Sequence, residues 1–96
     1  MLLQLTNRAK ADLLEIAQYT EEKWGPNQRN AYISQIDDAF LSLTKNHRLG
    51  VACDYIREGY FKFFVGKHVL YYRIIDTSMV QIVRILHGSM DVEQNL

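Results

Sequence analysis

The spacing of hydrophobic residues changes once along this 96-residue chain, close to residue 54. Before that point apolar residues recur every three to four positions, which is typical of amphipathic helices. After it, aromatic and β-branched residues dominate, and seven of the eleven aromatic residues lie between Tyr55 and Tyr72. That composition favours strands. We therefore expect a helical first half and a β-sheet second half.

The helical half is expected to be a hairpin of two helices over residues 7–46. Thr6 can accept a hydrogen bond from the first turn and so cap the first helix. Gly25 suits a helix C-terminus, and Pro26 can open the second helix. The apolar stripes of both helices should face the core, with Trp24 as an anchor at the turn.

The strand half is expected to form a sheet over residues 59–87, with a short N-terminal strand at 2–5. Gly66-Lys67 lies between two strand-like runs and fits a two-residue type II′ turn, which places Lys62 opposite Tyr71. The fold class is therefore α+β, in the order β-α-α-β-β-β. The helical hairpin should pack on one face of a small antiparallel sheet, within a single domain spanning 1–96.

The face of the sheet turned away from the helices should carry Tyr60, Lys62, Tyr71 and Arg73. The position of Arg84 depends on the turn at 76–78. An even-length turn places it opposite Tyr71 on this open face, and an odd-length turn moves it to the helix side. We expect the even turn, because an unpaired arginine in a small core is costly.

Apolar residues also lie on the open face, although only one helical layer is available to cover the sheet. We therefore infer that a partner chain covers the second face. The alternative is an ordinary solvated sheet face. Basic and aromatic side chains on that face could bind an anion, a nucleic acid or an acidic partner segment.

Charge and composition exclude several classes of protein. The chain has 11 Lys+Arg and 11 Asp+Glu, and this neutrality argues against broad nucleic-acid affinity. Its longest apolar run, at 69–72, is far shorter than the roughly 20 residues of a membrane span. With no signal-peptide pattern and one cysteine, we expect a cytoplasmic protein. The sequence shows no metal-ligand spacing and no cofactor motif.

A metal-free ribonuclease is one hypothesis for the open face. RNA cleavage needs a base for the 2′-hydroxyl, an acid for the leaving oxygen and cations for the phosphorane. No catalytic set stands out, but a nuclease would draw on Tyr71, Arg73, Arg84 and His87.

Four segments resemble ParE toxins of the RelE/ParE superfamily, and they cover about residues 3–91. They are the run 6–20 with Trp24-Gly25, the segment 56–60, the segment 66–74, and the closing Val-Arg-Ile-Leu-His-Gly-Ser-Met-Asp at 83–91. The resemblance implies a β-α-α-β-β-β fold. It also implies a toxin of a type II toxin–antitoxin system, with growth arrest and plasmid stabilisation as its effects.

The resemblance implies partners as well. A ParD-type antitoxin with a ribbon-helix-helix domain would neutralise the toxin, and operator DNA would be reached only through that antitoxin. DNA gyrase would be the target, inhibited by binding. One alternative is a ribosome-dependent mRNA endoribonuclease of RelE type, and another is a non-toxic antitoxin-binding co-repressor.

The residues expected to contact the target or the antitoxin lie mostly on the strands. Arg57 and Arg84 stand within the ParE-like segments, although both could instead form structural ion pairs with Glu58, Asp76 or Asp91. The full set of binding candidates is Arg57, Tyr60, Lys62, Tyr71, Arg73, Arg84 and His87.

Overall fold

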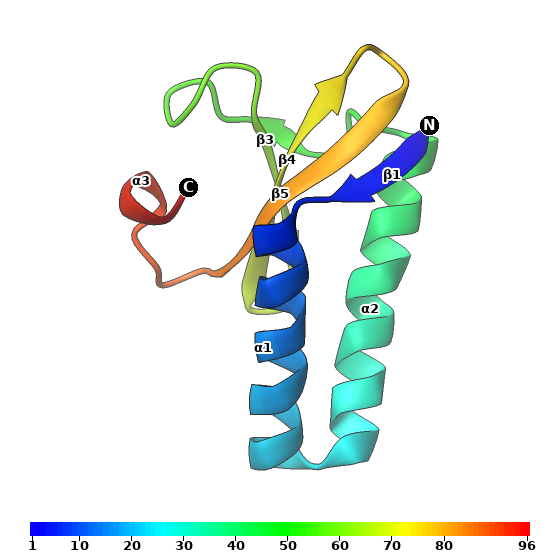
Figure 1. Cartoon of the computed structure of the whole chain (residues 1–96), viewed down its shortest axis with the longest axis vertical. Helices are drawn as coiled ribbons and strands as arrows, with labels where there is room; N and C mark the ends of the chain where they lie inside the picture. Colours follow the sequence, from blue (N-terminus) through cyan, green and yellow to red (C-terminus); the bar gives the residue numbers. More distant parts are fainter.

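The computed structural model describes all 96 residues and places two long helices against one five-stranded sheet (Figure 1). The elements follow in the order β1 (Leu2–Leu5), α1 (Asn7–Trp24), α2 (Pro26–Lys45), β2 (Val51–Ala52), β3 (Phe61–Val65), β4 (His68–Ile75), β5 (Met79–His87) and α3 (Val92–Asn95). The order of strands across the sheet is β1-β5-β4-β3-β2. The predicted α+β class is confirmed. None of the helices is long and apolar enough to cross a membrane.

The helical hairpin forms where its capping residues predict. The Thr6 hydroxyl accepts a hydrogen bond from the Ala9 amide at 3.1 Å and caps α1. Gly25 ends α1 with φ of 91°, and Pro26 opens α2. Figure 1 shows α1 and α2 side by side and antiparallel. The prediction for Trp24 was wrong, because its side chain is 64% exposed.

The β3–β4 hairpin has the predicted register. Lys62 pairs with Tyr71, and Val65 pairs with His68 across the Gly66-Lys67 turn. Gly66 has φ of 56°, and Lys67 keeps a negative φ, as a type II′ turn requires. The sheet as a whole is mixed rather than antiparallel, because β1 lies parallel to β5. Two helices separate β1 from the other strands in sequence, so nothing local constrained its direction.

The main core lies between the helical hairpin and one face of the sheet. Its fully buried side chains include Ile36 and Leu43 of α2, Leu70 and Tyr72 of β4, and Ile82 of β5. The apolar stripes predicted for the helices are thus core in both cases. Hydrogen bonds extend this core to the loop after α2, since the Tyr72 hydroxyl donates to the His47 carbonyl at 2.7 Å.

The β4–β5 turn is odd in length, contrary to the expectation. Ile75 pairs with Met79 across three residues, and Asp76 and Thr77 both have positive φ. A β-bulge at residue 83 then corrects the register, so that Tyr71 still pairs with Arg84. The bulge thus returns Arg84 to the strand position expected of an even turn, but the Arg84 side chain does not join Arg73 on the open face. Its guanidinium lies buried against Asp12 of α1.

The second face of the sheet is partly covered by the chain itself, which corrects the argument that a partner chain must cover it. Five buried residues form a second apolar cluster there: Cys53, Tyr60, Val69, Tyr71 and Leu86. Val92 and Leu96, at the C-terminus, pack against this cluster, as does Ile56 from the loop before β3. In Figure 1 this loop and α3 lie on the same side of the sheet, away from α2.

Candidate functional site

The structure separates the predicted binding residues into two places. Tyr60, Lys62, Tyr71 and Arg73 occupy the second face of the sheet, together with Arg57 from the preceding loop. Arg84 and His87 line a groove between α1 and the end of the β4–β5 pair. The single patch expected from the sequence therefore does not exist, and each part has its own chemistry.

On the second face, the two tyrosines serve as packing residues. Tyr60 and Tyr71 are both buried, Tyr71 to 6% exposure. Burial raises the pKa of the Tyr71 hydroxyl, with Lys62 acting in the opposite direction. A buried hydroxyl with a raised pKa is poorly placed to act as a general base. Tyr71 is thus a structural residue of the second cluster.

The cations on this face lie over aromatic rings. Arg57 and Arg73 both contact the Tyr60 ring, with guanidinium carbons 5.9 and 6.0 Å from its centroid. Arg73 also donates through Nε to the Gln81 side chain at 2.7 Å. Neither arginine has a carboxylate partner, so the structural pairing considered for Arg57 is absent.

Lys62 is held between two exposed aromatic rings. Its Nζ donates to the Tyr55 hydroxyl at 2.7 Å and lies 5.5 and 5.6 Å from the rings of Tyr55 and Phe64. The hydrogen bond to Tyr55 raises the pKa of the Lys62 ammonium. Tyr55 and Phe64 are 72% and 63% exposed. Lys62, Tyr55 and Phe64 thus form an exposed aromatic and basic surface.

Arg84 forms a buried ion pair with Asp12. Its Nε and a second guanidinium nitrogen donate to the two carboxylate oxygens of Asp12, at 2.7 and 2.9 Å. Asp12 and Arg84 are 9% and 8% exposed. The hydrogen bond to Asp12 raises the pKa of the guanidinium further above its usual value. A third nitrogen donates to the Asn95 carbonyl at the end of α3.

Asp12 was not identified from the sequence as the partner of Arg84. Its position did carry a signal, because it lies three residues after Ala9 and four before Ile16, on the apolar face of α1. A carboxylate at such a position needs a buried partner. Asp12 also accepts a hydrogen bond from the Ile85 amide at 3.0 Å. This bond gives the Ile85 amide a partner on the edge of β5, at a point beyond the end of β1.

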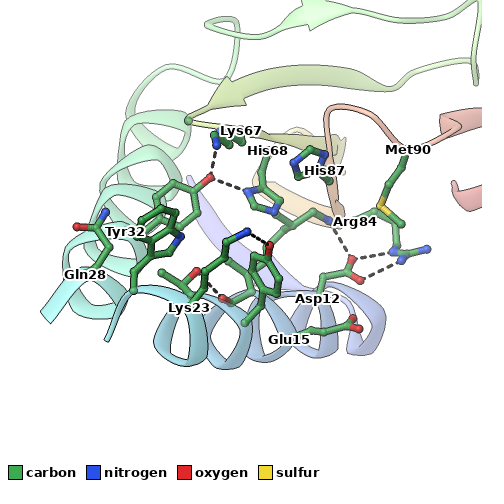
Figure 2. Close-up of a pocket in the computed structure, with 16 residues that line it drawn as sticks. Asp12, Glu15, Lys23, Gln28, Tyr32, Lys67, His68, Arg84, His87 and Met90 are labelled. Carbon is green, nitrogen blue, oxygen red and sulfur yellow. Dashed lines mark hydrogen bonds and ion pairs between the residues drawn. The ribbon is translucent and has the colours of Figure 1, made fainter. Parts of the chain in front are cut away.

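The groove has a volume of about 870 Å³ and is lined by residues of α1, α2, the Gly66-Lys67 turn and β5. His87 meets His68 there, with ring centroids 5.4 Å apart and the rings nearly perpendicular. Figure 2 shows Tyr32, Lys67 and His68 together on one side of this groove, with Asp12 and Arg84 at the other.

Hydrogen bonds orient both imidazole rings. The Tyr32 hydroxyl lies 2.6 Å from Nδ1 of His68 and accepts from the Lys67 amide at 3.2 Å. Nδ1 of His87 accepts from the Ser89 amide at 3.1 Å. Burial lowers the pKa of His68, and the nearby His87 lowers it further. No three His, Cys, Asp or Glu side chains come together as a metal site would require.

The fold is similar to that of two chains from solved structures of toxin–antitoxin systems. It matches a chain from the chromosomal ParDE system of P. aeruginosa with a TM-score of 0.79 and 21% identity, covering 91% of this chain and 95% of that one. It also matches a chain from the RelBE2 toxin–antitoxin complex of Mycobacterium tuberculosis with a TM-score of 0.65 and 23% identity, covering 90% and 95%.

Sequence relatives define the family. The family model described as "ParE toxin of type II toxin-antitoxin system, parDE" matches residues 3–92. Toxin ParE1 of Mycobacterium tuberculosis is 40% identical over 92 residues, which cover 96% of this chain and 94% of that protein. Toxin ParE1 of Caulobacter vibrioides is 33% identical over 93 residues, covering 97% and 95%. The chain belongs to the ParE family of type II toxin–antitoxin toxins.

Proposed function

We propose that this ParE-family toxin is neutralised by a ParD-type antitoxin of the ribbon-helix-helix class and that the free toxin inhibits DNA gyrase by binding it. The match to the ParE model over residues 3–92 carries this proposal. Operator DNA would then be reached only through the antitoxin. Because gyrase acts on the chromosome, the proposal places the toxin in the cytoplasm.

The arrangement of side chains supports action by binding rather than by catalysis. Of the four residues suited to RNA cleavage, Tyr71 is buried in the second cluster and Arg84 is paired with Asp12. Arg73 lies on the second face, hydrogen-bonded to Gln81, and only His87 reaches the groove with a free ring nitrogen. These four groups do not converge on one phosphate position, as an acid, a base and cations would need to.

A supercoiling assay tests the target. Purified toxin added to gyrase, ATP and relaxed plasmid is expected to block supercoiling or to trap cleaved DNA. The matched control is the same toxin first saturated with its antitoxin. Uninhibited gyrase at a large molar excess of toxin would contradict the proposal.

A translation reaction distinguishes the RelE-type endoribonuclease from a gyrase inhibitor. Toxin added to ribosomes translating a defined mRNA is expected to leave the transcript intact. New mRNA ends at the ribosomal A site would instead establish the endoribonuclease. Unarrested growth after induction without antitoxin would favour the non-toxic co-repressor.

The antitoxin is expected to contact the aromatic and basic surface around Lys62, because Tyr55 and Phe64 are large, apolar and exposed. Hydrogen exchange of the toxin, alone and in complex with a ParD-type antitoxin, tests this. Protection across residues 60–86 is expected to increase. Unchanged protection there, with protection gained on α1 and α2, would place the antitoxin on the helices.

A further inference from the structure

We propose that the groove between α1 and the end of the β4–β5 pair binds a nucleoside phosphate, with the phosphate at the histidine pair and the base against the aromatic residues of α1. This inference concerns a small anionic ligand and does not depend on the gyrase proposal. The groove volume of about 870 Å³ lies within the range of small-molecule sites, roughly 300–1,000 Å³.

The donors at the sheet side of the groove fit an anion. The Ser89 amide donates to Nδ1 of His87, so the neutral ring carries its proton on Nε2, which has no partner in the chain. Lys67 follows at the turn, and its ammonium forms no ion pair. His68 completes this side of the groove, held by Tyr32. A ring nitrogen that already carries a proton favours an anion over a metal ion.

Charge in the groove is complementary to phosphate. Asp12 also lines the groove, but Arg84 neutralises the charge of Asp12. Both carboxylate oxygens of Asp12 accept hydrogen bonds from Arg84. Glu15 is the remaining carboxylate of the lining. Against it stand the ammonium groups of Lys23 and Lys67. The net charge is therefore positive locally, although the whole chain is neutral.

The aromatic side of the groove fits a planar base. Tyr19 and Trp24 line it from the last turns of α1 and are 59% and 64% exposed. The Lys23 ammonium lies 5.6 and 5.9 Å from their ring centroids. Large aromatic rings left exposed beside a groove are a stacking surface, since stacking on a base contributes about 1–3 kcal/mol. Trp24, expected to be an anchor at the turn between the helices, is exposed here.

The single tryptophan of the chain makes the test direct. Full-length toxin is titrated with adenosine monophosphate while Trp24 fluorescence is followed with excitation at 295 nm, and histidine side-chain shifts are followed by NMR. Quenching and shifts of both His68 and His87 are expected to saturate together. No change in either signal up to 10 mM ligand would overturn the proposal.

Titrations with parts of the ligand, and titrations of three variants with adenosine monophosphate, locate the contacts. Adenosine without phosphate and inorganic phosphate alone are each expected to bind at least tenfold more weakly than adenosine monophosphate. His87→Asn and Lys67→Gln should each weaken binding about tenfold, and Lys45→Gln, at the end of α2 outside the groove, should not change it. If adenosine or inorganic phosphate bound as tightly as adenosine monophosphate, the two-part site would be overturned. The same holds if Lys67→Gln bound adenosine monophosphate as tightly as the unchanged toxin.

Discussion

The ion pair between Asp12 and Arg84 joins the first helix to the last long strand, and it changes what Arg84 can do. A buried guanidinium is tolerated only where a carboxylate and further acceptors use its donors. Asp12 and the Asn95 carbonyl supply these acceptors. Arg84 is therefore a structural residue that ties α1, β5 and α3 together, whereas the sequence indicated a surface binding residue.

Replacing the charge of Asp12 tests this role. Asp12→Asn keeps the shape of the side chain but leaves the Arg84 guanidinium buried without a counter-charge. We expect the free energy of unfolding to fall by about 3–5 kcal/mol, measured by urea denaturation. The control is Asp38→Asn on the exposed side of α2, which should change stability by less than about 0.5 kcal/mol. Equal losses in the two variants would contradict the role.

His68 should make stability depend on pH. Burial lowers its pKa in the folded protein below the ordinary value of 6.5. As pH falls through that value, the unfolded chain takes up the proton first, so stability decreases with decreasing pH. Urea denaturation at pH 7.5 and 5.5 is expected to show a smaller loss for His68→Gln than for the wild type. The control, His47→Gln in the loop after α2, should lose as much as the wild type.

At the scale of elements, tight turns and caps decide how the helices and strands meet. The Thr6 hydroxyl accepts from Ala9 and also donates to the Val83 carbonyl at 2.8 Å. One side chain thus begins α1 and fixes it beside the bulge of β5. The Gly66-Lys67 turn similarly brings β3 and β4 against Tyr32 of α2, whose hydroxyl contacts the Lys67 amide and His68.

Gly66→Ala tests the contact between the turn and α2. Gly66 has φ of 56°, and a Cβ there would lie 2.6 Å from the Tyr32 ring. The matched control is Gly59→Ala, where φ is 80° but nothing lies within 4 Å of an added Cβ. Backbone strain alone should cost Gly59→Ala about 1–2 kcal/mol. Thermal or urea unfolding should show a larger loss for Gly66→Ala, and equal losses would contradict the steric contact.

At the scale of the whole molecule, the chain covers both faces of its sheet, one with the helical hairpin and the other with its C-terminal residues. The C-terminal residues cover only a small part of the second face, because α3 has four residues. They nevertheless make the binding surface smaller than an open sheet face, leaving the rings around Lys62 as its exposed part. Family membership and this exposed surface therefore support an antitoxin partner, whereas an uncovered sheet face does not exist.

Removing the C-terminal cover should expose the second cluster. The double variant Val92→Ser, Leu96→Ser withdraws the two apolar side chains that pack there. We expect increased binding of a hydrophobic dye and a loss of about 1–3 kcal/mol in the free energy of unfolding. Glu93→Gln, exposed on the same helix, should leave both measurements unchanged. Unchanged dye binding in the double variant would show that the cover is not required.

The sequence by itself determined the elements whose causes are local. Periodicity placed the two helices, Thr6, Gly25 and Pro26 marked their ends, and Gly66-Lys67 set the register of β3 against β4. The four ParE-like segments identified the family. Each of these features depends on residues within a few positions of one another, so it can be predicted from the sequence alone.

The tertiary structure alone decided the features that join distant residues. The parallel pairing of β1 with β5 and the pairing of Asp12 with Arg84 each join residues more than 70 positions apart. The bulge at residue 83 lies between the neighbouring strands β4 and β5, and no turn or capping residue in the sequence marks it. The bulge compensates for the odd turn and returns Arg84 to its position opposite Tyr71. The Asp12 carboxylate then holds the Arg84 guanidinium against α1 rather than beside Arg73. This ion pair separates the groove from the second face.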